Sequence, residues 1–492
     1  MTKIKFRAPE YQHDGAFKER EFEFEGDEKS GWTIRRDGQT IYTLASGYTP
    51  VQSYYCGVCS TDLARKFLPY PLPQIIGHEV VGKKDGKMVV VEINASLRAR
   101  GVIDPENPYS QGSMHVHDPR RITLGINRLS GGFAPVFLAP VDAIIPLPSE
   151  INPLVASLTE PFAAALQGVE ATFPRQGERV AVLGPRRLGS LIIAALAGFR
   201  QQQGINFEIC AIARHPHLLK VCQTLGADRA IDLQQIPIEQ LKNEFDVVFD
   251  TTGKPEGFAL ALDLARRAVH LKSTHGQKVL GLQHLTDMVV DEIALLPAKP
   301  ENFNFTWEIE AKERKNPNIY VAEDIPNSAV ARLLSEVVEN RQFHRISIEA
   351  AINKIQNNDL KGSPFPRFDL AIAGSLSTVD RILRPIAGEE FSLVRPRGAI
   401  MLYDRDRTEN SPLYQAVCDR HLEIHSSRCG NFRRALNILQ QNPAIRVALE
   451  KNLITHRYSL NDIASAFEIA GDSSKSIKVI VETSRFFDED KY

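Results

Sequence analysis

The feature that most constrains this chain is an alternation of short apolar strands and longer helices that begins near residue 180. The segment ERVAVLGPRRLGSLIIAALAGFR predicts a buried strand, a glycine-containing turn and an apolar helix. The next segment, FEICAIARHPHLLKVCQTLGADRAID, repeats this order, and FDVVFDTTG predicts another buried strand. Strands that alternate with helices of this length pair in parallel, because each helix crosses over the sheet. We therefore predict an α/β fold with a doubly wound parallel sheet.

A different pattern precedes this block. Between Trp32 and Leu147, short apolar segments such as VGKKDGKMVVVEI are separated by frequent glycine and proline, which is typical of a β-rich domain. Residues 1–31 are charged and show no clear period. The alanine-rich segment PLVASLTEPFAAALQGVEAT predicts a helix that links the two patterns. Because 492 residues exceed what one ordinary core accommodates, we expect at least two domains.

The second half of the chain contains a candidate partial repeat. Phe245-Asp246-Val247-Val248 and Phe368-Asp369-Leu370-Ala371 open blocks with the same order of strands and helices. The alternative is that any strand–helix–strand unit resembles another. The intervening segment is charged and rich in asparagine, and is interpreted as an insertion. The expected division is a β-rich domain over 1–150, a domain with a parallel sheet over 151–296, the insertion over 297–367, the second block over 368–428, and a return to the first domain over 429–492.

Composition excludes several classes of protein. The chain has 59 Lys and Arg against 60 Asp and Glu, so its net charge of −1 favours neither a nucleic-acid partner nor an acidic lipid surface. No apolar run approaches the roughly 20 residues that span a bilayer. The N-terminal segment MTKIKFRAPEYQHDG lacks the apolar core of a signal peptide. The six cysteines are scattered and do not suggest a disulfide framework. We expect a cytoplasmic protein without nucleic-acid or membrane partners.

Two short segments, SYYCGVCSTD and IIGHEVVG, carry residues that suit a metal. A catalytic zinc takes three protein ligands and leaves a fourth position open. Cys59 can supply a thiolate, His78 an imidazole, and either Glu79 or Glu160 a carboxylate. A lone cysteine is more often a small buried hydrophobe, but the combination favours zinc. Cys56 could be a second thiolate, although packing is the favoured interpretation.

The order of these motifs resembles the zinc-containing medium-chain dehydrogenase/reductase family. GVCSTD and GHE match that family's ligand motifs, and TEPFAAALQG is similar to a helix of its polyol, glucose and threonine dehydrogenase branch. The resemblance covers about residues 32–296, resumes at SRCGNFRRALNILQ near the C-terminus, and omits 297–367. It implies a GroES-like catalytic domain, a Rossmann cofactor domain and, as in most members, a homodimer or homotetramer.

The resemblance also implies roles for individual residues. Cys59, His78 and Glu160 match the zinc ligands, and Glu79 is a candidate to exchange onto the metal. Thr61 matches the hydroxyl that passes on the alcohol proton, and Asp62 the carboxylate that orients the ligand histidine. Many relatives bind a second, structural zinc through four cysteines. The corresponding stretch here, NASLRARGVIDPENPYSQGSMHVHDPRRITLGI, has no cysteine, so we expect one catalytic zinc and no structural zinc.

The turn after the first strand of the parallel sheet is a candidate dinucleotide site. A strand, Gly-x-Gly-x-x-Gly and a helix together place a pyrophosphate at the helix N-terminus. The turn here is Gly184-Pro185-Arg186-Arg187-Leu188-Gly189, in which Arg186 replaces the middle glycine and either shifts the cofactor or offers it a charge. Thr252, with its neighbours, closes the strand that resemblance places near the nicotinamide ribose.

The next strand bears on the choice between NAD and NADP. NAD enzymes place an acidic residue at its end to hold the ribose 2′-hydroxyl. Ala213 occupies that position here and Arg214 follows, which favours NADP over NAD; the alternative is that Arg214 is only a surface residue.

Together these observations predict a zinc-dependent, NAD(P)-linked dehydrogenase. It would oxidise a small-molecule alcohol, reversibly, by hydride transfer. The family branch suggests a polar secondary alcohol of polyol, sugar or amino-alcohol type. The competing hypothesis is a non-catalytic scaffold that keeps the fold, motivated by Arg186 and by the long insertion. A third hypothesis keeps catalysis but has the insertion cover the cleft and admit an unusual, carrier-bound substrate.

Overall fold

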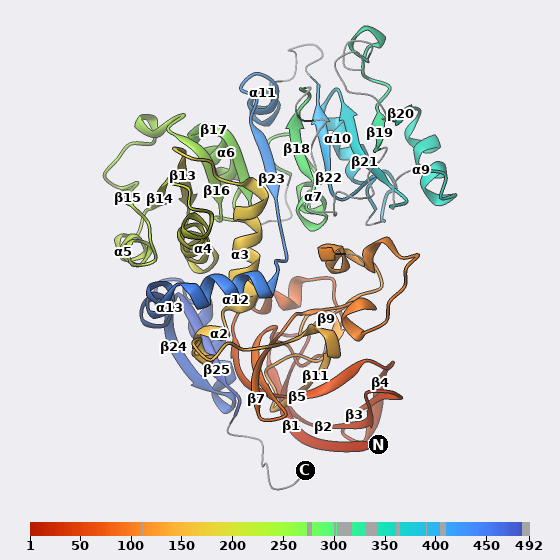
Figure 1. Ribbon diagram of the computed structural model, residues 1–492, viewed down its shortest axis with the longest axis vertical. Helices are drawn as coiled ribbons and strands as arrows, with labels where there is room; N and C mark the ends of the chain where they lie inside the picture. Colours follow the sequence, from red (N-terminus) through yellow and green to blue (C-terminus); the bar gives the residue numbers. More distant parts are fainter. Residues whose placement is uncertain are drawn as a thin grey trace. The chain divides into compact units, whose positions relative to one another are not determined.

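The computed structural model divides the chain into two compact units (Figure 1). The first unit comprises Met1–Ala163 and Cys429–Tyr492, and the second comprises Ala164–Arg428. Within the described residues, no helix combines the length and the apolar composition needed to cross a membrane. The structure describes residues 1–110, 112–272, 278–299, 302, 317–330, 342–360, 365–389, 391–403 and 410–484.

The N-terminus of the first unit forms a four-stranded antiparallel sheet. Its strands are β1 (Thr2–Tyr11), β2 (Phe17–Asp27), β3 (Gly31–Arg36) and β4 (Gln39–Leu44), in that order. One face carries aromatic side chains: the Phe6 ring lies 5.7 Å from Phe22 and 4.9 Å from Phe24. The other face carries ion pairs such as Lys3 with Glu23 at 3.0 Å. The charged segment 1–31, in which no period was apparent, thus alternates between an apolar and a charged face.

A second sheet, of seven described strands, is the frame of the candidate site. Its path is β12-β7-β6-β5-β25-β24, and β11 pairs with β5. Strand β5 is antiparallel to both neighbours, with Gly57 opposite Glu79 in β6 and opposite Ile480 in β25. The C-terminal part of the chain therefore completes this N-terminal sheet. The strands are β5 (Tyr48–Gly57), β6 (Glu79–Lys84), β7 (Lys87–Val91), β11 (Val136–Pro140), β12 (Ile144–Pro146), β24 (Ile454–Ser459) and β25 (Lys478–Glu482).

Smaller elements complete the first unit. A three-stranded sheet joins β10 (Arg128–Leu129), β9 (Ile122–Leu124) and β8 (Asn94–Ala95). The helices are α1 (Ser60–Leu63), α2 (Pro153–Ala156), α12 (Phe432–Gln441), α13 (Pro443–Ala448) and α14 (Ile463–Gly471). Helix α3 (Thr159–Thr172) begins in the first unit and ends in the second.

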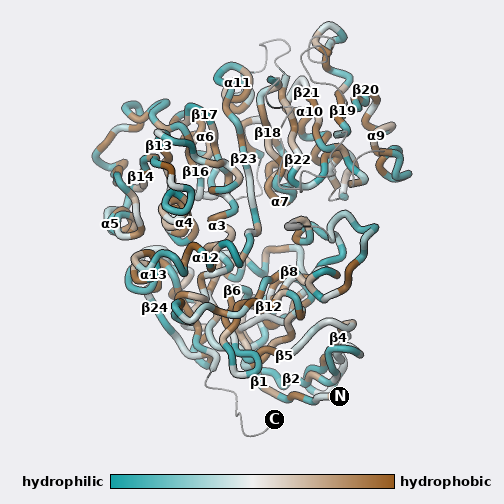
Figure 2. Tube along the Cα trace, viewed as in Figure 1, coloured by the Kyte–Doolittle hydropathy of each residue, from teal (hydrophilic) through white to brown (hydrophobic). Residues whose placement is uncertain are grey.

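The second unit contains an eleven-stranded sheet among its described residues. The order is β15-β14-β13-β16-β17-β23-β18-β22-β21-β19-β20, and neighbours are parallel except for β23 and β18. Figure 2 shows hydrophobic stretches along these strands, in agreement with the buried pattern of β13 and β16. The strands are β13 (Arg179–Leu183), β14 (Glu208–Ala213), β15 (Arg229–Asp232), β16 (Phe245–Asp250), β17 (Ala265–Leu271), β18 (Ala294–Pro297), β19 (Asn318–Val321), β20 (Gln342–Arg345), β21 (Phe368–Ala373), β22 (Val394–Leu402) and β23 (Glu423–Ser426).

The helices of this unit connect successive strands, as expected for a doubly wound sheet. They are α4 (Arg187–Gln203), α5 (Pro216–Thr224), α6 (Pro255–Leu264), α7 (Leu285–Val290), α9 (Ile348–Gln356), α10 (Leu376–Leu383) and α11 (Pro412–Cys418). Residues 297–367, interpreted from sequence as an insertion, supply β19, β20 and α9 to this unit.

The two halves of the large sheet make the same contacts at corresponding aspartates. Asp246 in β16 accepts a hydrogen bond from the backbone N–H of Arg179 and pairs with Arg266 in β17. Asp369 in β21 accepts one from the backbone N–H of Asn318 and pairs with Arg395 in β22. These contacts match β13, β16 and β17 with β19, β21 and β22.

The final strand of each half is exchanged. Strand β18 follows β17 in sequence but pairs in parallel with β22, whereas β23 follows β22 but pairs in parallel with β17. The exchanged strands then meet each other, with Leu295 opposite Ile424. A buried core therefore runs from Ala181 through Ile424 to Ile400 without a break between the halves.

Candidate active site

Cys59 is held at the end of β5 by the first turn of a short helix. It is the N-cap residue of α1, with extended backbone angles, and is partly exposed. Its backbone N–H donates to Oδ2 of Asp62 at 2.9 Å. Asp62 is fully buried, so the bond fixes the turn and with it the direction of the Cys59 side chain.

His78 and Glu79 follow a glycine that no other residue could replace. Gly77 has φ +98, and a Cβ there would lie 2.6 Å from the Phe133 ring and 2.8 Å from Cys56 Sγ. The turn therefore requires glycine twice over, for its backbone angle and for its lack of a side chain. It delivers both acid–base side chains into the interior, where His78 is 3% and Glu79 1% exposed.

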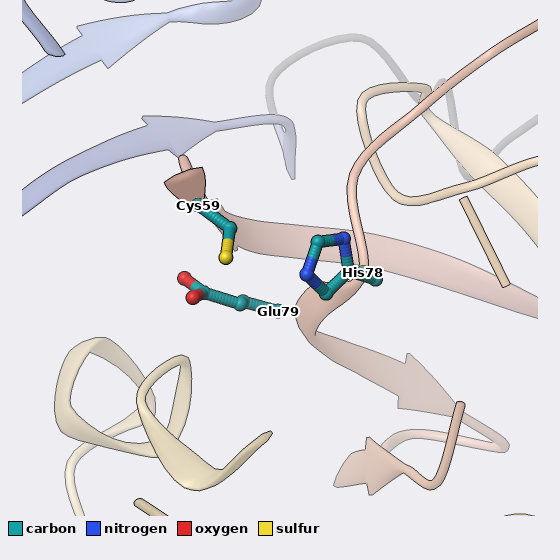
Figure 3. Close-up of side chains that lie close together, drawn as sticks. All are labelled: Cys59, His78 and Glu79. Carbon is teal, nitrogen blue, oxygen red and sulfur yellow. The ribbon is translucent and has the colours of Figure 1, made fainter. Parts of the chain in front are cut away.

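The structure brings Cys59, His78 and Glu79 together (Figure 3). One ligand atom of each lies within 4.8 Å of the others. Sulfur, imidazole nitrogen and carboxylate oxygen form a donor set that suits zinc. Across the described residues, this is the one group of histidine, cysteine and acidic side chains with such spacing. The residues present therefore fit the metal that the sequence predicts.

Asp62 also lies against the histidine of this group. His78 Nδ1 is 3.4 Å from Asp62 Oδ1, which leaves the other ring nitrogen for a metal. Burial lowers the pKa of His78, but the charges of Asp62 and Cys59 raise it, and the pKa lies well above its usual range. A metal would have to displace this proton, so its binding would strengthen as pH rises.

Cys56 does not join the group. Its sulfur is buried beside the Gly77 turn, and burial raises the pKa of the Cys56 thiol well above the usual value. A protonated thiol is a poor metal ligand, in keeping with its packing interpretation. Thr61 and Asp62 lie within α1, two and three residues after Cys59.

Glu160, the predicted acidic ligand, lies in the first turn of α3 and is half-buried. It is not one of the three residues whose ligand atoms cluster. Its assignment as a ligand stays a prediction.

Lys478 contacts this group and was not singled out from sequence. Its ammonium forms an ion pair with Oε2 of Glu79 and donates to the backbone oxygen of Val58 at 3.0 Å. The sequence gives one signal for this residue: a lysine stands at the start of an apolar strand, in the segment SIKVIVE, where a charged residue is unusual.

The predicted dinucleotide turn lies between β13 and α4. Gly184 has φ +73, and Gly189 is buried in the first turn of the helix, where a Cβ would lie 2.7 Å from Thr251 Oγ1. Arg187 and Leu188 open the helix and are partly exposed. The hydroxyl of Thr251 donates to the backbone oxygen of Gly184 at 2.8 Å and fixes the turn.

Arg186 occupies the middle position with an ordinary negative φ of −100. Arg186 adopts a φ that is open to any residue, although its ψ of −127 lies outside the usual α and β regions. It serves as the N-cap of α4, whose 17 residues point their N-terminus at this turn. An anion at this end would meet the backbone N–H groups of the first turn and the positive end of the helix dipole.

Arg214 and Thr252 lie at the same edge of the sheet. Arg214 directly follows β14 and is exposed, and β14 runs parallel to β13. Thr252 follows β16, which is parallel to β13 on its other side, and its hydroxyl donates to Asp250 at 2.7 Å. The predicted cofactor residues therefore gather at the carboxyl ends of three adjacent strands.

Known proteins similar to this chain are dehydrogenases, although no family model matches it. Sorbitol dehydrogenase of Halalkalibacterium halodurans is 28% identical over 233 residues, which cover 43% of this chain and 64% of that protein. L-idonate 5-dehydrogenase (NAD(P)(+)) of Escherichia coli is 26% identical over 299 residues, or 56% of this chain and 82% of that protein. The first match thus spans just under two thirds of the relative.

The fold is similar to that of solved dehydrogenases. The crystal structure of L-idonate 5-dehydrogenase from Escherichia coli aligns over 98% of this chain and 99% of its own, with a TM-score of 0.56 and 14% identity. This confirms the predicted fold class, a GroES-like β-rich domain with a Rossmann domain. By its sequence relatives and its fold, the chain is similar to zinc-type medium-chain alcohol dehydrogenases, as the sequence predicts.

Proposed function

We propose that this protein is a zinc-dependent, NAD(P)-linked dehydrogenase that reversibly oxidises a polar secondary alcohol. The observation that carries the proposal is the group of Cys59, His78 and Glu79, whose ligand atoms lie within 4.8 Å of one another. A thiol, an imidazole and a carboxylate gathered from two separate segments suit a catalytic rather than a structural zinc, which would take four closed ligands.

The substrate class is supported by the relatives. Their names refer to sorbitol and L-idonate, which are polyhydroxylated compounds. We infer a substrate of the same kind, a polyol, sugar or amino alcohol with a secondary hydroxyl.

Each residue of the site has a proposed role. Cys59 and His78, with an acidic residue, would hold the metal, and Asp62 would keep the His78 ring oriented. Thr61, two residues after Cys59, would take the proton of the alcohol and pass it towards solvent. When bound, zinc would supply the Lewis acidity that lowers the pKa of the alcohol, and the nicotinamide would accept the hydride.

The cofactor would bind at the carboxyl edge of the large sheet. Gly184 and Gly189 let the turn pack against Thr252 and Thr251, which holds the N-terminus of α4 where a pyrophosphate would bind. Exposed Arg214, with no acidic residue at the preceding position, favours a 2′-phosphate and therefore NADP over NAD. The Escherichia coli relative is named for both cofactors.

Metal analysis combined with a dehydrogenase screen tests the proposal. The purified protein is assayed for zinc and for turnover of sugars, polyols and threonine with NAD and with NADP. We expect about one zinc per chain, and loss of zinc and of at least about 100-fold in turnover for Cys59→Ser, because a catalytic metal contributes several kcal/mol.

Cys429→Ser is the matched control, since Cys429 is also partly exposed and belongs to the same unit. This variant should keep both metal and activity. Retained zinc and turnover in Cys59→Ser would refute the ligand assignment. A metal-free wild type that is indifferent to both cofactors would favour a non-catalytic scaffold.

A further inference from the structure

The two halves of the eleven-stranded sheet run in opposite directions. Along the sheet, the first half extends from β15 to β23 and the second from β18 to β20. Among these described strands, β23 and β18 form the one antiparallel junction, with Leu295 opposite Ile424. Both side chains are fully buried in the core that the two halves share. The sheet therefore reverses at an apolar junction inside the protein.

The pairing of residues is the same on both sides of this junction. A row of paired residues leads away from it through each half. The rows are Ile424, Val269 and Val248 in the first half, and Leu295, Ile400 and Ala371 in the second. Val248 ends the segment FDVV and Ala371 ends FDLA, the two segments whose aspartates make the same contacts. Because each row reaches its counterpart in the same number of steps, Leu295 and Ile424 also occupy matching places.

A residue that faces its own counterpart across an antiparallel junction marks a two-fold axis. In a symmetric dimer, an isologous contact of this kind joins two copies of one chain. Here Leu295 and Ile424 belong to the same chain. The second half therefore takes, on this sheet, the place that a second copy of the first half would take.

The outer strands of the sheet are poorly suited to pairing with another chain. Strands β15 and β20 lie at the two ends of its described path, and each has four residues. Both contain charged side chains, Arg229 and Asp232 in β15 and Arg345 in β20. Short edge strands with charges discourage pairing between chains. The apolar strands β18 and β23, by contrast, cover each other.

We propose that the second half of the large sheet is a built-in partner, which replaces a second subunit and leaves no edge of this sheet for another chain to join. Because both halves belong to one polypeptide, they associate at an effective concentration on the order of mM for short linkers, which favours them over a second chain. The exchange of β18 and β23 ties them together further. A homodimer or homotetramer of this protein would therefore use other surfaces. The inference does not depend on the proposed function.

Disulfide mapping tests whether the junction forms within one chain. Facing residues of an antiparallel pair lie close enough for a disulfide. Leu295→Cys combined with Ile424→Cys should oxidise to a disulfide within that chain, which peptide mass mapping distinguishes from bonds to the native cysteines. The two single variants, unfolded together, refolded and oxidised, should not form this disulfide. A bond between positions 295 and 424 of two different chains would overturn the inference.

Leu296→Cys combined with Ile424→Cys is the matched control. Leu296 follows Leu295 in β18, and its side chain packs in the core on the opposite face of the sheet. This pair should form no disulfide, either within one chain or between two chains.

Hydrogen exchange of the unaltered protein provides a second test, which needs no substitution in the core. Amide exchange in β15 and β20 is measured by mass spectrometry over about a 100-fold range of protein concentration, and sedimentation velocity gives the oligomeric state. Exchange in both strands should stay constant, whichever oligomer is present. Protection of β15 or β20 that rises with concentration would mean that another chain joins the sheet, and the proposal would then be wrong.

Discussion

Gly57 shows how one missing side chain makes the metal group possible. It stands opposite Glu79 in the sheet, and the space that a Cβ would fill is taken by the Glu79 carboxylate and the Lys478 stem. A larger residue would push the carboxylate out of the position it shares with Cys59 and His78.

Gly57→Ala should therefore lower the free energy of unfolding by about 1–3 kcal/mol, the usual cost of overpacking, and weaken metal binding. The free energy is measured by urea unfolding of the metal-free protein. Gly471→Ala is the control, because nothing lies within 4 Å of a Cβ added there. Equal stability of the two variants would contradict the steric argument.

His270 gives the second unit a dependence on pH. The ring is fully buried in β17, with Thr172 Oγ1 2.6 Å from one nitrogen and Ser427 Oγ 2.9 Å from the other. Burial and, next, the charge of Lys272 lower the pKa of His270 well below its usual value. The unfolded chain then binds the proton more readily than the folded one.

The free energy of unfolding should therefore be highest above about pH 6.5. It should decrease as the pH is lowered further, by up to about 1.4 kcal/mol per pH unit. The amide of His270→Gln can still bond to the same two hydroxyls. This variant should lose the part of the pH dependence of the unfolding free energy that the histidine causes. Urea unfolding at several pH values measures both proteins, and identical slopes would exclude the histidine as the cause.

The sequence predicts Cys59, His78 and Glu79 among the candidate ligands, but not the lysine that balances the charge of Glu79. Two short motifs that are separated only by a loop contain Cys59, His78 and Glu79. Their potential as metal ligands can therefore be recognised from the sequence alone. Lys478 comes about 400 residues later, and only the pairing of β25 with β5 brings it to Glu79. A contact that depends on sheet register at long range leaves no local pattern.

At the scale of elements, the paired aspartates offer a comparison within one protein. The Arg395 side chain is 2% exposed and bonds to Asp369 at 2.7 Å, whereas Arg266 is 41% exposed and lies 3.0 Å from Asp246. The two pairs occupy matching places in the two halves of the sheet and differ mainly in burial.

Arg395→Met should destabilise the second unit by about 3–5 kcal/mol, because it leaves a buried carboxylate without its cation. Arg266→Met should cost less than about 1 kcal/mol, as exposed pairs do. Thermal or urea unfolding of both variants measures the difference. Comparable losses would mean that the aspartates are balanced by their backbone donors alone.

Three strands could not be recognised from the sequence, all for the same reason. Strands β1 and β2 lie in a charged segment in which only a few aromatic residues mark the alternation between an apolar and a charged face. Strand β19 has only four residues and lies within a charged stretch. Their apolar residues become meaningful only against neighbouring strands. The strands of β13 and β16, by contrast, are continuous apolar runs and were predicted directly.

At the scale of the molecule, the second half of the large sheet has the architecture of a nucleotide domain but a different loop. Where Gly184 follows β13 in the first half, Asp324 follows the matching strand β19. Its carboxylate accepts hydrogen bonds from Gly374 N–H at 3.2 Å and Thr378 Oγ1 at 2.7 Å, at the start of α10. This carboxylate lies in the loop after β19, and would repel a phosphate that approached this edge of the sheet.

We therefore expect one dinucleotide per chain. Equilibrium dialysis or calorimetry with NADP and NAD measures the stoichiometry, with Asp324→Asn as the companion variant. Two molecules per chain would contradict the expectation. Binding of none would instead count against the proposed cofactor site at Gly184. The homodimer or homotetramer implied by the family stays a prediction.

The exchange of β18 and β23 has a consequence for how the protein is made. A ribosome that has released the first 290 residues has produced five strands of the first half of the sheet, but the strand that pairs with β17 is β23, which ends at Ser426. The sheet of the first unit likewise lacks β25 (Lys478–Glu482), which pairs with β5, until these residues have been synthesised. Neither part can close its sheet during most of translation, so apolar strand edges stay exposed until nearly the whole polypeptide has emerged. Nascent chains of this protein should therefore depend on chaperones, and truncation before β25 should yield aggregates rather than a shortened folded protein.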